Sequence, residues 1–274
     1  MTSLVGPGGT ADGTPSGAVE VPPRILELAR EAARVCVLTG AGISAESGIP
    51  TFRDAQVGLW ERFDPLELAT PGAWAADPAQ VWAWYAWRAT LVRRAQPNPG
   101  HLALAGWQAR PGVRLGIVTQ NVDDLHERAG SEVLAHVHGS LFALRCSVCG
   151  RPGGAVYPEL DEPVARVDPP PCDTCGGPVR PGVVWFGEAL PEDGFLAAVD
   201  VAREADLLLV VGTSGLVHPA ATIPHLAGVG GVPVVEVNPA PTAVTEAADE
   251  VWRATAAAAL PALVARLGDV GPRG

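Results

Sequence analysis

The chain has 274 residues, 47% of them hydrophobic, which suits one large domain or a core carrying a smaller module. Its net charge of −11 and pI of about 4.9 argue against nucleic acid or an anionic membrane as the main partner, and fit a basic protein segment. No apolar run approaches the roughly 20 residues that span a bilayer. Residues 1–22, rich in Gly, Pro, Thr and Ser, predict a disordered tail and not a signal peptide.

The first ordered elements are a helix over residues 23–34 and a short apolar strand over residues 35–39. The strand ends in Gly40-Ala41-Gly42, where glycines allow a tight turn and close approach of backbone to a ligand. Ser44 then begins a helix whose free N–H groups suit phosphate. This stretch predicts the pyrophosphate end of a nucleotide site.

Further strands and helices alternate along the rest of the chain. Several short helices are expected over residues 59–99, the longest over 78–94, followed by helices over 101–108 and 125–129 and a closing helix over 261–267. Strands are expected over residues 115–119, 133–137, 207–211 and 234–237, and extended structure over 183–187. This layout predicts a doubly wound parallel α/β sheet, in which ligands bind beyond the carboxyl ends of the strands.

Polar groups follow several of these strands. They are Gln120-Asn121-Val122-Asp123, Gly212-Thr213-Ser214 and Asn238-Pro239-Ala240. Any single group of this kind is more simply a helix cap, but together they favour a nucleotide site at the sheet edge. An ordinary dehydrogenase would continue from its glycine turn through a helix and a second strand to an acidic residue, whereas this chain breaks at Pro50.

Four of the five cysteines form two Cys-x-x-Cys pairs, Cys146 with Cys149 and Cys172 with Cys175. Two such pairs supply four thiolates for tetrahedral Zn²⁺ and leave no open position, which predicts one structural zinc ion. Metal binding in place of disulfides also favours a reducing cytoplasm. A zinc ribbon that binds nucleic acid is the alternative, but the chain lacks a dense basic cluster. Cys36 lies in the first strand and is expected to be a small buried hydrophobe.

Taken together, these motifs resemble the sirtuins, the Sir2 family of NAD-dependent protein-lysine deacylases. The resemblance covers residues 23–267 and includes His138-Gly139 and the stretch Gly48-Ile49-Pro50-x-Phe52-Arg53. It implies a Rossmann-like NAD domain of residues 23–54, 106–141 and 183–267. It also implies a small domain formed by the helical insertion 55–105 and the zinc module 142–182, with a tail over 268–274.

The resemblance also implies site roles. The acyl oxygen of the modified lysine attacks the ribose carbon as nicotinamide leaves, which gives an imidate bound to ADP-ribose. His138 acts as general base on the ribose hydroxyls so that the 2′ oxygen attacks the imidate carbon, and water completes the reaction to give O-acyl-ADP-ribose and free lysine. Asn121 joins His138 as a catalytic residue. The NAD-binding residues are Gly40, Ala41, Gly42, Ser44, Thr51, Phe52, Arg53, Gln120, Asn121, Val122, Asp123, Gly212, Thr213, Ser214, Asn238, Pro239, Ala240 and Ala256. For the other five histidines we expect ordinary packing or surface roles.

Tyr85 and Arg88 indicate which acyl group is removed. They lie three residues apart on the helix over 78–94, so both can face one cavity, and an arginine with a nearby phenol suits a carboxylate. The pair resembles the one that marks the desuccinylase and demalonylase subclass of sirtuins, and Ala69 matches a small residue that leaves room for the longer acyl chain. A surface or ion-pair role for Arg88 is the alternative.

The substrate backbone is expected to lie as an extended strand between residues 184–188, including Val184, Trp185, Phe186 and Gly187, and residues 215–217. The expected partners are proteins or peptides that carry acyl-lysine, with no nucleic acid and no membrane, and the chain is expected to be a monomer. A plain deacetylase, an ADP-ribosyltransferase and a non-enzymatic NAD sensor are the alternative functions.

Overall fold

The structure is a computed structural model that describes residues 19–49 and 64–268. Most of the expected N-terminal tail therefore lies outside the described residues. The predicted NAD-binding residues Thr51, Phe52 and Arg53 also lie outside them.

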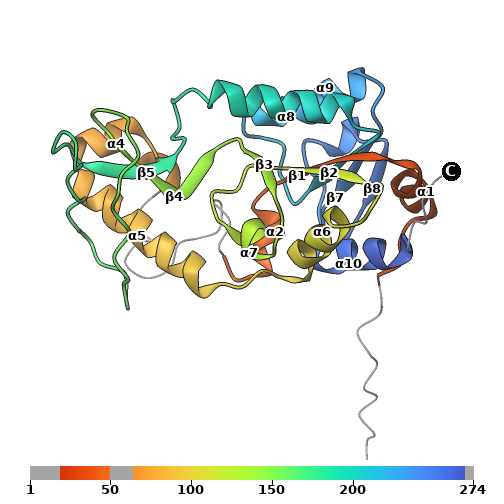
Figure 1. The fold of residues 1–274 in the computed structure, drawn as a ribbon, viewed down its shortest axis with the longest axis horizontal. Helices are drawn as coiled ribbons and strands as arrows, with labels where there is room; N and C mark the ends of the chain where they lie inside the picture. The colour runs from red at the N-terminus through yellow and green to blue at the C-terminus, as the bar shows by residue number, and fades with distance from the viewer. Residues whose placement is uncertain (1–18, 50–63, 269–274) are drawn as a thin grey trace, which may run out of the picture.

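A six-stranded parallel sheet forms one end of the molecule, on the right in Figure 1, which confirms the predicted α/β class. The strand order is β3-β2-β1-β6-β7-β8. Successive strands are added outward on one side of β1 and then, from β6 on, outward on the other side, so the order reverses between the neighbouring strands β1 and β6. Ligands of doubly wound sheets bind where the strand order reverses, at the carboxyl ends. The strands are β1 (Arg34–Thr39), β2 (Arg114–Thr119), β3 (Val133–His136), β6 (Leu207–Val211), β7 (Val234–Val237) and β8 (Glu250–Trp252).

Helices cover both faces of this sheet, as Figure 1 shows with α8 and α9 above it and α6 and α10 below. Strand side chains alternate between the faces, so the sheet is buried on both sides in two apolar cores. The core on one face includes Ile25, Trp107 and Leu260, and the core on the other includes Ala198 and Ile223. The helices are α1 (Pro23–Glu31), α2 (Gly42–Ala45), α6 (Pro99–Gln108), α7 (Leu125–Arg128), α8 (Glu192–Glu204), α9 (Ile223–Val229) and α10 (Ala256–Arg266), with short 3₁₀ turns at Ala220–Thr222 and Thr245–Ala247.

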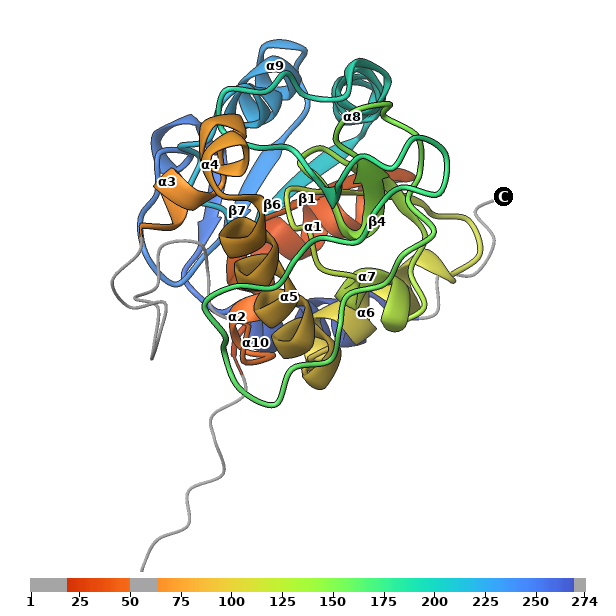
Figure 2. The same cartoon turned by 90° about the vertical axis from the view of Figure 1, so that its left-hand side faces the viewer.

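A second, antiparallel pair of strands lies at the other end of the molecule, β4 (Gly139–Cys146) with β5 (Val179–Val183). Figure 2 views this end, which is built from α3 (Pro65–Leu68), α4 (Pro71–Ala76), α5 (Pro78–Arg94) and β4. A third apolar core joins these elements, and its largest members are aromatic: Trp82 and Trp84 of α5, Tyr157 and Trp185. The helical insertion and the cysteine-bearing segment thus share one core.

Three expectations need correction. The closing helix begins at Ala256 and not at Pro261, which lies inside it, because Thr255 and the following alanines start the helix one and a half turns earlier. The extended structure expected over residues 183–187 is shorter than predicted, since β5 ends at Val183 and residues 186–187 form a turn. Helix α2 begins at Gly42 and has only four residues, so Ser44 lies within it and not at its start. Among the described residues, no helix is long and apolar enough to cross a membrane.

Candidate functional site

A cavity of about 1140 Å³ opens at the carboxyl ends of the parallel strands and extends to the antiparallel end of the molecule. This volume lies just above the range of about 300–1,000 Å³ that is typical of sites for one small ligand. It brings together most of the predicted site residues: Gly40, Ala41, Gly42, Ser44, Ala69, Tyr85, Arg88, Gln120, Asn121, Val122, Asp123, His138, Val184, Trp185, Phe186, Gly187, Gly212, Thr213, Ser214 and Asn238.

The glycine turn after β1 packs directly against the turn after β6. The Gly40 N–H donates to the Val211 carbonyl at 3.0 Å, and the Gly42 N–H donates to the Gly212 carbonyl at 2.8 Å. A Cβ atom on Gly42 would lie 2.7 Å from the Gly212 oxygen, and Gly212 itself has φ of +63°. The glycines are therefore required first for contact between two backbones, and the joined turns form the floor of the cavity.

Ser44 lies between two polar residues that follow β2. The Asn121 amide donates to the Ser44 hydroxyl at 3.1 Å, and that hydroxyl donates to the Asp123 carboxylate at 3.0 Å. All three residues are buried. Burial raises the pKa of Asp123, although the Leu125 N–H and the Ser44 hydroxyl both stabilise its charged form. This chain of hydrogen bonds fixes the Asn121 amide at the cavity wall.

Two histidines at the end of β3 hold the backbone that follows β2. His138 Nδ1 lies 3.1 Å from the Gln120 carbonyl, and His136 Nδ1 lies 3.1 Å from the Asn121 carbonyl. A carbonyl only accepts, so Nδ1 of His138 must carry the proton, and in the neutral ring Nε2 is then unprotonated. His138 Nε2 is buried and has no hydrogen-bond partner among the described residues. Burial lowers the pKa of His138, so the ring is neutral at pH 7 and Nε2 is ready to accept a proton.

The remaining strand ends are tied together by side chains. The Gln120 amide donates to the Thr213 hydroxyl at 2.9 Å, and the Asn238 amide donates to the Thr213 carbonyl at 3.0 Å. These bonds join the segments that follow β2, β6 and β7 into one polar edge.

Ala69, Tyr85 and Arg88 line the other end of the same cavity. Ala69 and Tyr85 are buried, and Arg88 is half-buried with its guanidinium 4.9 Å from the centre of the Trp84 ring. Burial lowers the pKa of Arg88, but an arginine remains charged at neutral pH. Burial also raises the pKa of Tyr85 to about 12, so its hydroxyl is neutral and can donate. This wall therefore combines one cation with one neutral donor.

Some residues fall outside the expected pattern. Among the described residues that were predicted for the site, Pro239, Ala240 and Ala256 do not line the cavity. Sequence reasoning missed His218, for which an ordinary packing or surface role was expected because no motif singled it out, but which lines the cavity. It also missed the ion pair of Arg180 with Glu188, of which Glu188 lines the cavity, since the two residues carry no spacing signal.

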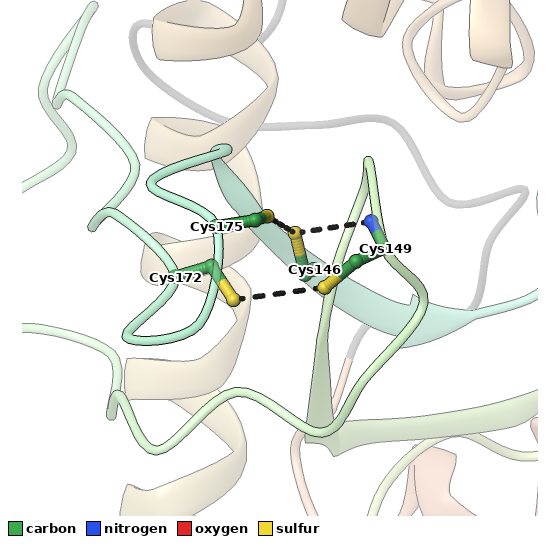
Figure 3. A group of neighbouring side chains, drawn as sticks. All are labelled: Cys146, Cys149, Cys172 and Cys175. Carbon is green, nitrogen blue, oxygen red and sulfur yellow. Dashed lines mark hydrogen bonds between the residues drawn. The ribbon is translucent and has the colours of Figure 1, made fainter.

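The four cysteines of the two Cys-x-x-Cys pairs come together, with their sulfur atoms within 4.8 Å of one another (Figure 3). Cys146 Sγ lies 3.5 Å from Cys175 Sγ, and Cys149 Sγ lies 3.8 Å from Cys172 Sγ. Tetrahedral Zn²⁺ with bonds of about 2.3 Å separates its sulfur ligands by about 3.8 Å, so the cluster fits the ion. Four protein ligands make this site structural. Cys36 is buried in β1, and burial raises its pKa to about 12.

Comparison with known proteins gives consistent results. The Sir2 family model matches residues 40–219. A Mycobacterium tuberculosis protein named NAD-dependent protein deacylase is 53% identical over 85% of this chain and 98% of its own length. A Corynebacterium efficiens protein named NAD-dependent protein deacylase 2 is 52% identical over 89% and 96%.

Solved structures match equally well. A Sir2 homologue in complex with NAD has a TM-score of 0.82 and 44% identity, covering 91% of this chain and 95% of the homologue. A Sir2 homologue mutant in complex with 2′-O-acetyl-ADP-ribose has a TM-score of 0.81 and 43% identity, covering 90% and 96%. The chain belongs to the Sir2 family.

Proposed function

We propose that this Sir2 enzyme, an NAD-dependent protein deacylase, removes succinyl and malonyl groups from lysine side chains in preference to acetyl groups. One observation carries the preference: Tyr85 and Arg88 line the same cavity as His138 and Asn121. An acyl chain whose lysine end lies near His138 and Asn121 can therefore place a terminal carboxylate near the Arg88 guanidinium and the Tyr85 hydroxyl.

The setting of Arg88 favours an anionic ligand. Its guanidinium is half-buried beside the Trp84 ring, where water screens charge less than at an open surface. A carboxylate bound there accepts charge-assisted hydrogen bonds, which are about twice as strong as neutral ones. An acetyl group ends in a methyl and offers no such acceptor. Ala69, which is small and buried at the same end of the cavity, leaves room for the longer chain.

His138 and Asn121 are the residues that we propose for the chemistry. NAD, when bound, supplies the ADP-ribosyl group that accepts the acyl group. Nε2 of His138 is the only ring nitrogen available to take a proton from a hydroxyl, because Nδ1–H is held by the Gln120 carbonyl. The Asn121 amide is held by Ser44 and presents a neutral polar group to the nicotinamide end.

The NAD and peptide sites follow from the same cavity. We propose that NAD lies along the joined turns at Gly40–Gly42 and Gly212–Ser214 and reaches Asn238. The peptide is proposed to lie between residues 184–188 and 215–217. The N–H groups of Val184 and Phe186 already donate to the His138 and Ala69 carbonyls, so these two groups are occupied before a peptide binds. The shared aromatic core supports the division into a Rossmann-like domain and a small domain of residues 55–105 and 142–182.

Arg88→Met tests the acyl preference with matched succinyl-, malonyl- and acetyl-lysine peptides. We expect kcat/KM for desuccinylation to fall by about 10²-fold and for deacetylation by less than about tenfold, since only the carboxylate loses its partner. Arg94→Met on the same helix is the matched control, because Arg94 does not line the cavity. Equal loss of both activities would refute the preference. Mass spectrometry should detect O-succinyl-ADP-ribose; an ADP-ribosylated acceptor protein would indicate a transferase instead.

A further inference from the structure

The hydroxyl of Tyr85 is held by an indole 100 residues away in the sequence. Trp185 Nε1 lies 3.0 Å from Tyr85 Oη, and both side chains are buried. An indole N–H can only donate, so the Tyr85 oxygen accepts this hydrogen bond. The single hydrogen of the Tyr85 hydroxyl must then point elsewhere. The described part of the chain places no acceptor against it, while Tyr85 lines the cavity.

Trp185 is itself anchored on several sides. Its backbone N–H donates to the Glu188 carboxylate at 2.9 Å, and the Arg180 guanidinium lies 3.2 Å from its ring centre. Arg180 donates twice to Glu188, at 2.6 and 3.0 Å, and the Arg180 side chain is only 8% exposed. The Trp74 ring lies 5.6 Å away. Turning the indole would therefore separate a largely buried ion pair from an aromatic face.

We propose that Trp185 is a positioning residue that sets the specificity for acid acyl groups, by directing the Tyr85 hydroxyl hydrogen into the cavity toward the acyl carboxylate. This inference rests on the proposed preference for succinyl and malonyl groups. It concerns the Trp185 side chain, whereas the peptide is proposed to meet the backbone of residues 184–188.

Two physical effects follow from this arrangement. A donor that already points toward its acceptor loses little rotational freedom on binding, so more of the hydrogen-bond energy is realised as affinity. A hydroxyl that accepts a hydrogen bond is also polarised and becomes a better donor. Because burial keeps the pKa of Tyr85 at about 12, the hydroxyl stays neutral and does not repel the carboxylate.

Trp185→Phe tests the role, because phenylalanine keeps an aromatic face for Arg180 and removes only the N–H donor and part of the ring. The readout is the ratio of kcat/KM for succinyl-lysine to that for acetyl-lysine peptides. We expect this ratio to fall about five- to tenfold, mainly through a higher KM for the succinyl peptide. Trp74→Phe is the matched control, since it alters packing against Trp185 and leaves the indole hydrogen bond in place. Its ratio should stay within about twofold of wild type.

A double-mutant cycle separates positioning from general damage to the fold. In a Tyr85→Phe background no phenol oxygen remains to be held, so Trp185→Phe should change the ratio less than about twofold. An equal fall in both backgrounds, or no fall in the wild-type background, would overturn the role of Trp185. A different result would overturn the proposed function and this inference with it. In that case the wild-type enzyme would show no preference for acid acyl groups, and neither Tyr85→Phe nor Arg88→Met would change the ratio.

A spectroscopic measurement makes the test independent of turnover. The chain has two tyrosines, so ¹³Cζ-labelled tyrosine gives two NMR signals, which Tyr157→Phe assigns. The Tyr85 signal should shift when Trp185 is replaced by Phe and again when succinyl peptide binds the wild-type enzyme. A Tyr85 signal that Trp185→Phe leaves unmoved would overturn the hydrogen bond on which the inference depends.

Discussion

Ser44 provides the sharpest test of how the Asn121 end of the site is held. Its hydroxyl accepts from the Asn121 amide at 3.1 Å and donates to the Asp123 carboxylate at 3.0 Å, and its side chain is almost fully buried. Ser44→Ala removes both bonds and leaves an amide and a carboxylate buried with fewer partners.

The expected loss of stability can be worked from these two bonds. A buried neutral hydrogen bond contributes about 1 kcal/mol, and one to a charged group about 1.5–3 kcal/mol, so the variant should lose about 2.5–4 kcal/mol of unfolding free energy. Ser131→Ala is the matched control. Ser131 is also buried, but among the described residues its hydroxyl has no hydrogen-bond partner. Its replacement should change the unfolding free energy by less than about 0.5 kcal/mol.

The loss should depend on pH in a defined direction. Burial raises the pKa of Asp123, so its folded-state carboxyl binds a proton more tightly than the unfolded one and its ionisation destabilises the fold as pH rises. Removing the Ser44 donor raises this pKa further. The difference between wild type and Ser44→Ala should therefore be larger at pH 7 than near pH 4.

Urea denaturation of the two variants and the wild type at both pH values measures these effects, and KM for NAD in nicotinamide release reports the site. A loss below about 1 kcal/mol for Ser44→Ala, or an equal loss for Ser131→Ala, would show that the hydrogen-bond chain does not hold this part of the site. A difference that grows toward pH 4 would refute the assignment of charge to Asp123.

Two shorter predictions concern the base and the metal. Because burial lowers the pKa of His138, its neutral form persists below pH 6.5, the ordinary pKa of histidine. The acid limb of the pH profile of kcat/KM should therefore lie below pH 6.5. His138→Ala should abolish turnover. A limb well above pH 6.5 would contradict this. Cys172→Ser should lose the single bound zinc ion, measured by atomic absorption, whereas Cys36→Ser should keep about one per chain. Full zinc in Cys172→Ser would exclude the four-cysteine site.

The parts of the fold that local chemistry determines could be predicted from the sequence. Strands β6 and β7 match their expected bounds because β6 is an unbroken leucine and valine run and three of the four residues of β7 are valine, which suits a sheet buried on both faces. Helix α5 matches from Pro78 to Arg94 because Pro78 suits a helix start and no other proline interrupts it. Helix α8 and strand β8 were missed: β8 has only three residues and begins at Glu250, too short for a periodic signal.

The candidate site was predictable where its residues lie within one motif and not where contacts cross the chain. Asn121 and Asp123 follow the same strand, so their shared location could be expected. Their link through Ser44 could not, since it depends on the packing of the Gly40–Gly42 turn against Gly212. The hydrogen bond from Trp185 to Tyr85 likewise spans 100 residues, and neither residue carries a signal for the other.

Strand β5 shows why such distant contacts still depend on the sequence around them. It pairs Val179 with Cys146 at the metal end, then carries Arg180 beneath the Trp185 ring, and ends two residues before that ring. The cysteine cluster therefore fixes the start of β5, and β5 in turn fixes the indole that holds Tyr85. The metal site lies apart from the cavity and supplies no reactive group, so it can influence Tyr85 only through the five residues of β5. If Tyr85 and Arg88 bind the acyl carboxylate as we propose, we expect loss of the zinc ion to weaken acyl recognition through this backbone pairing.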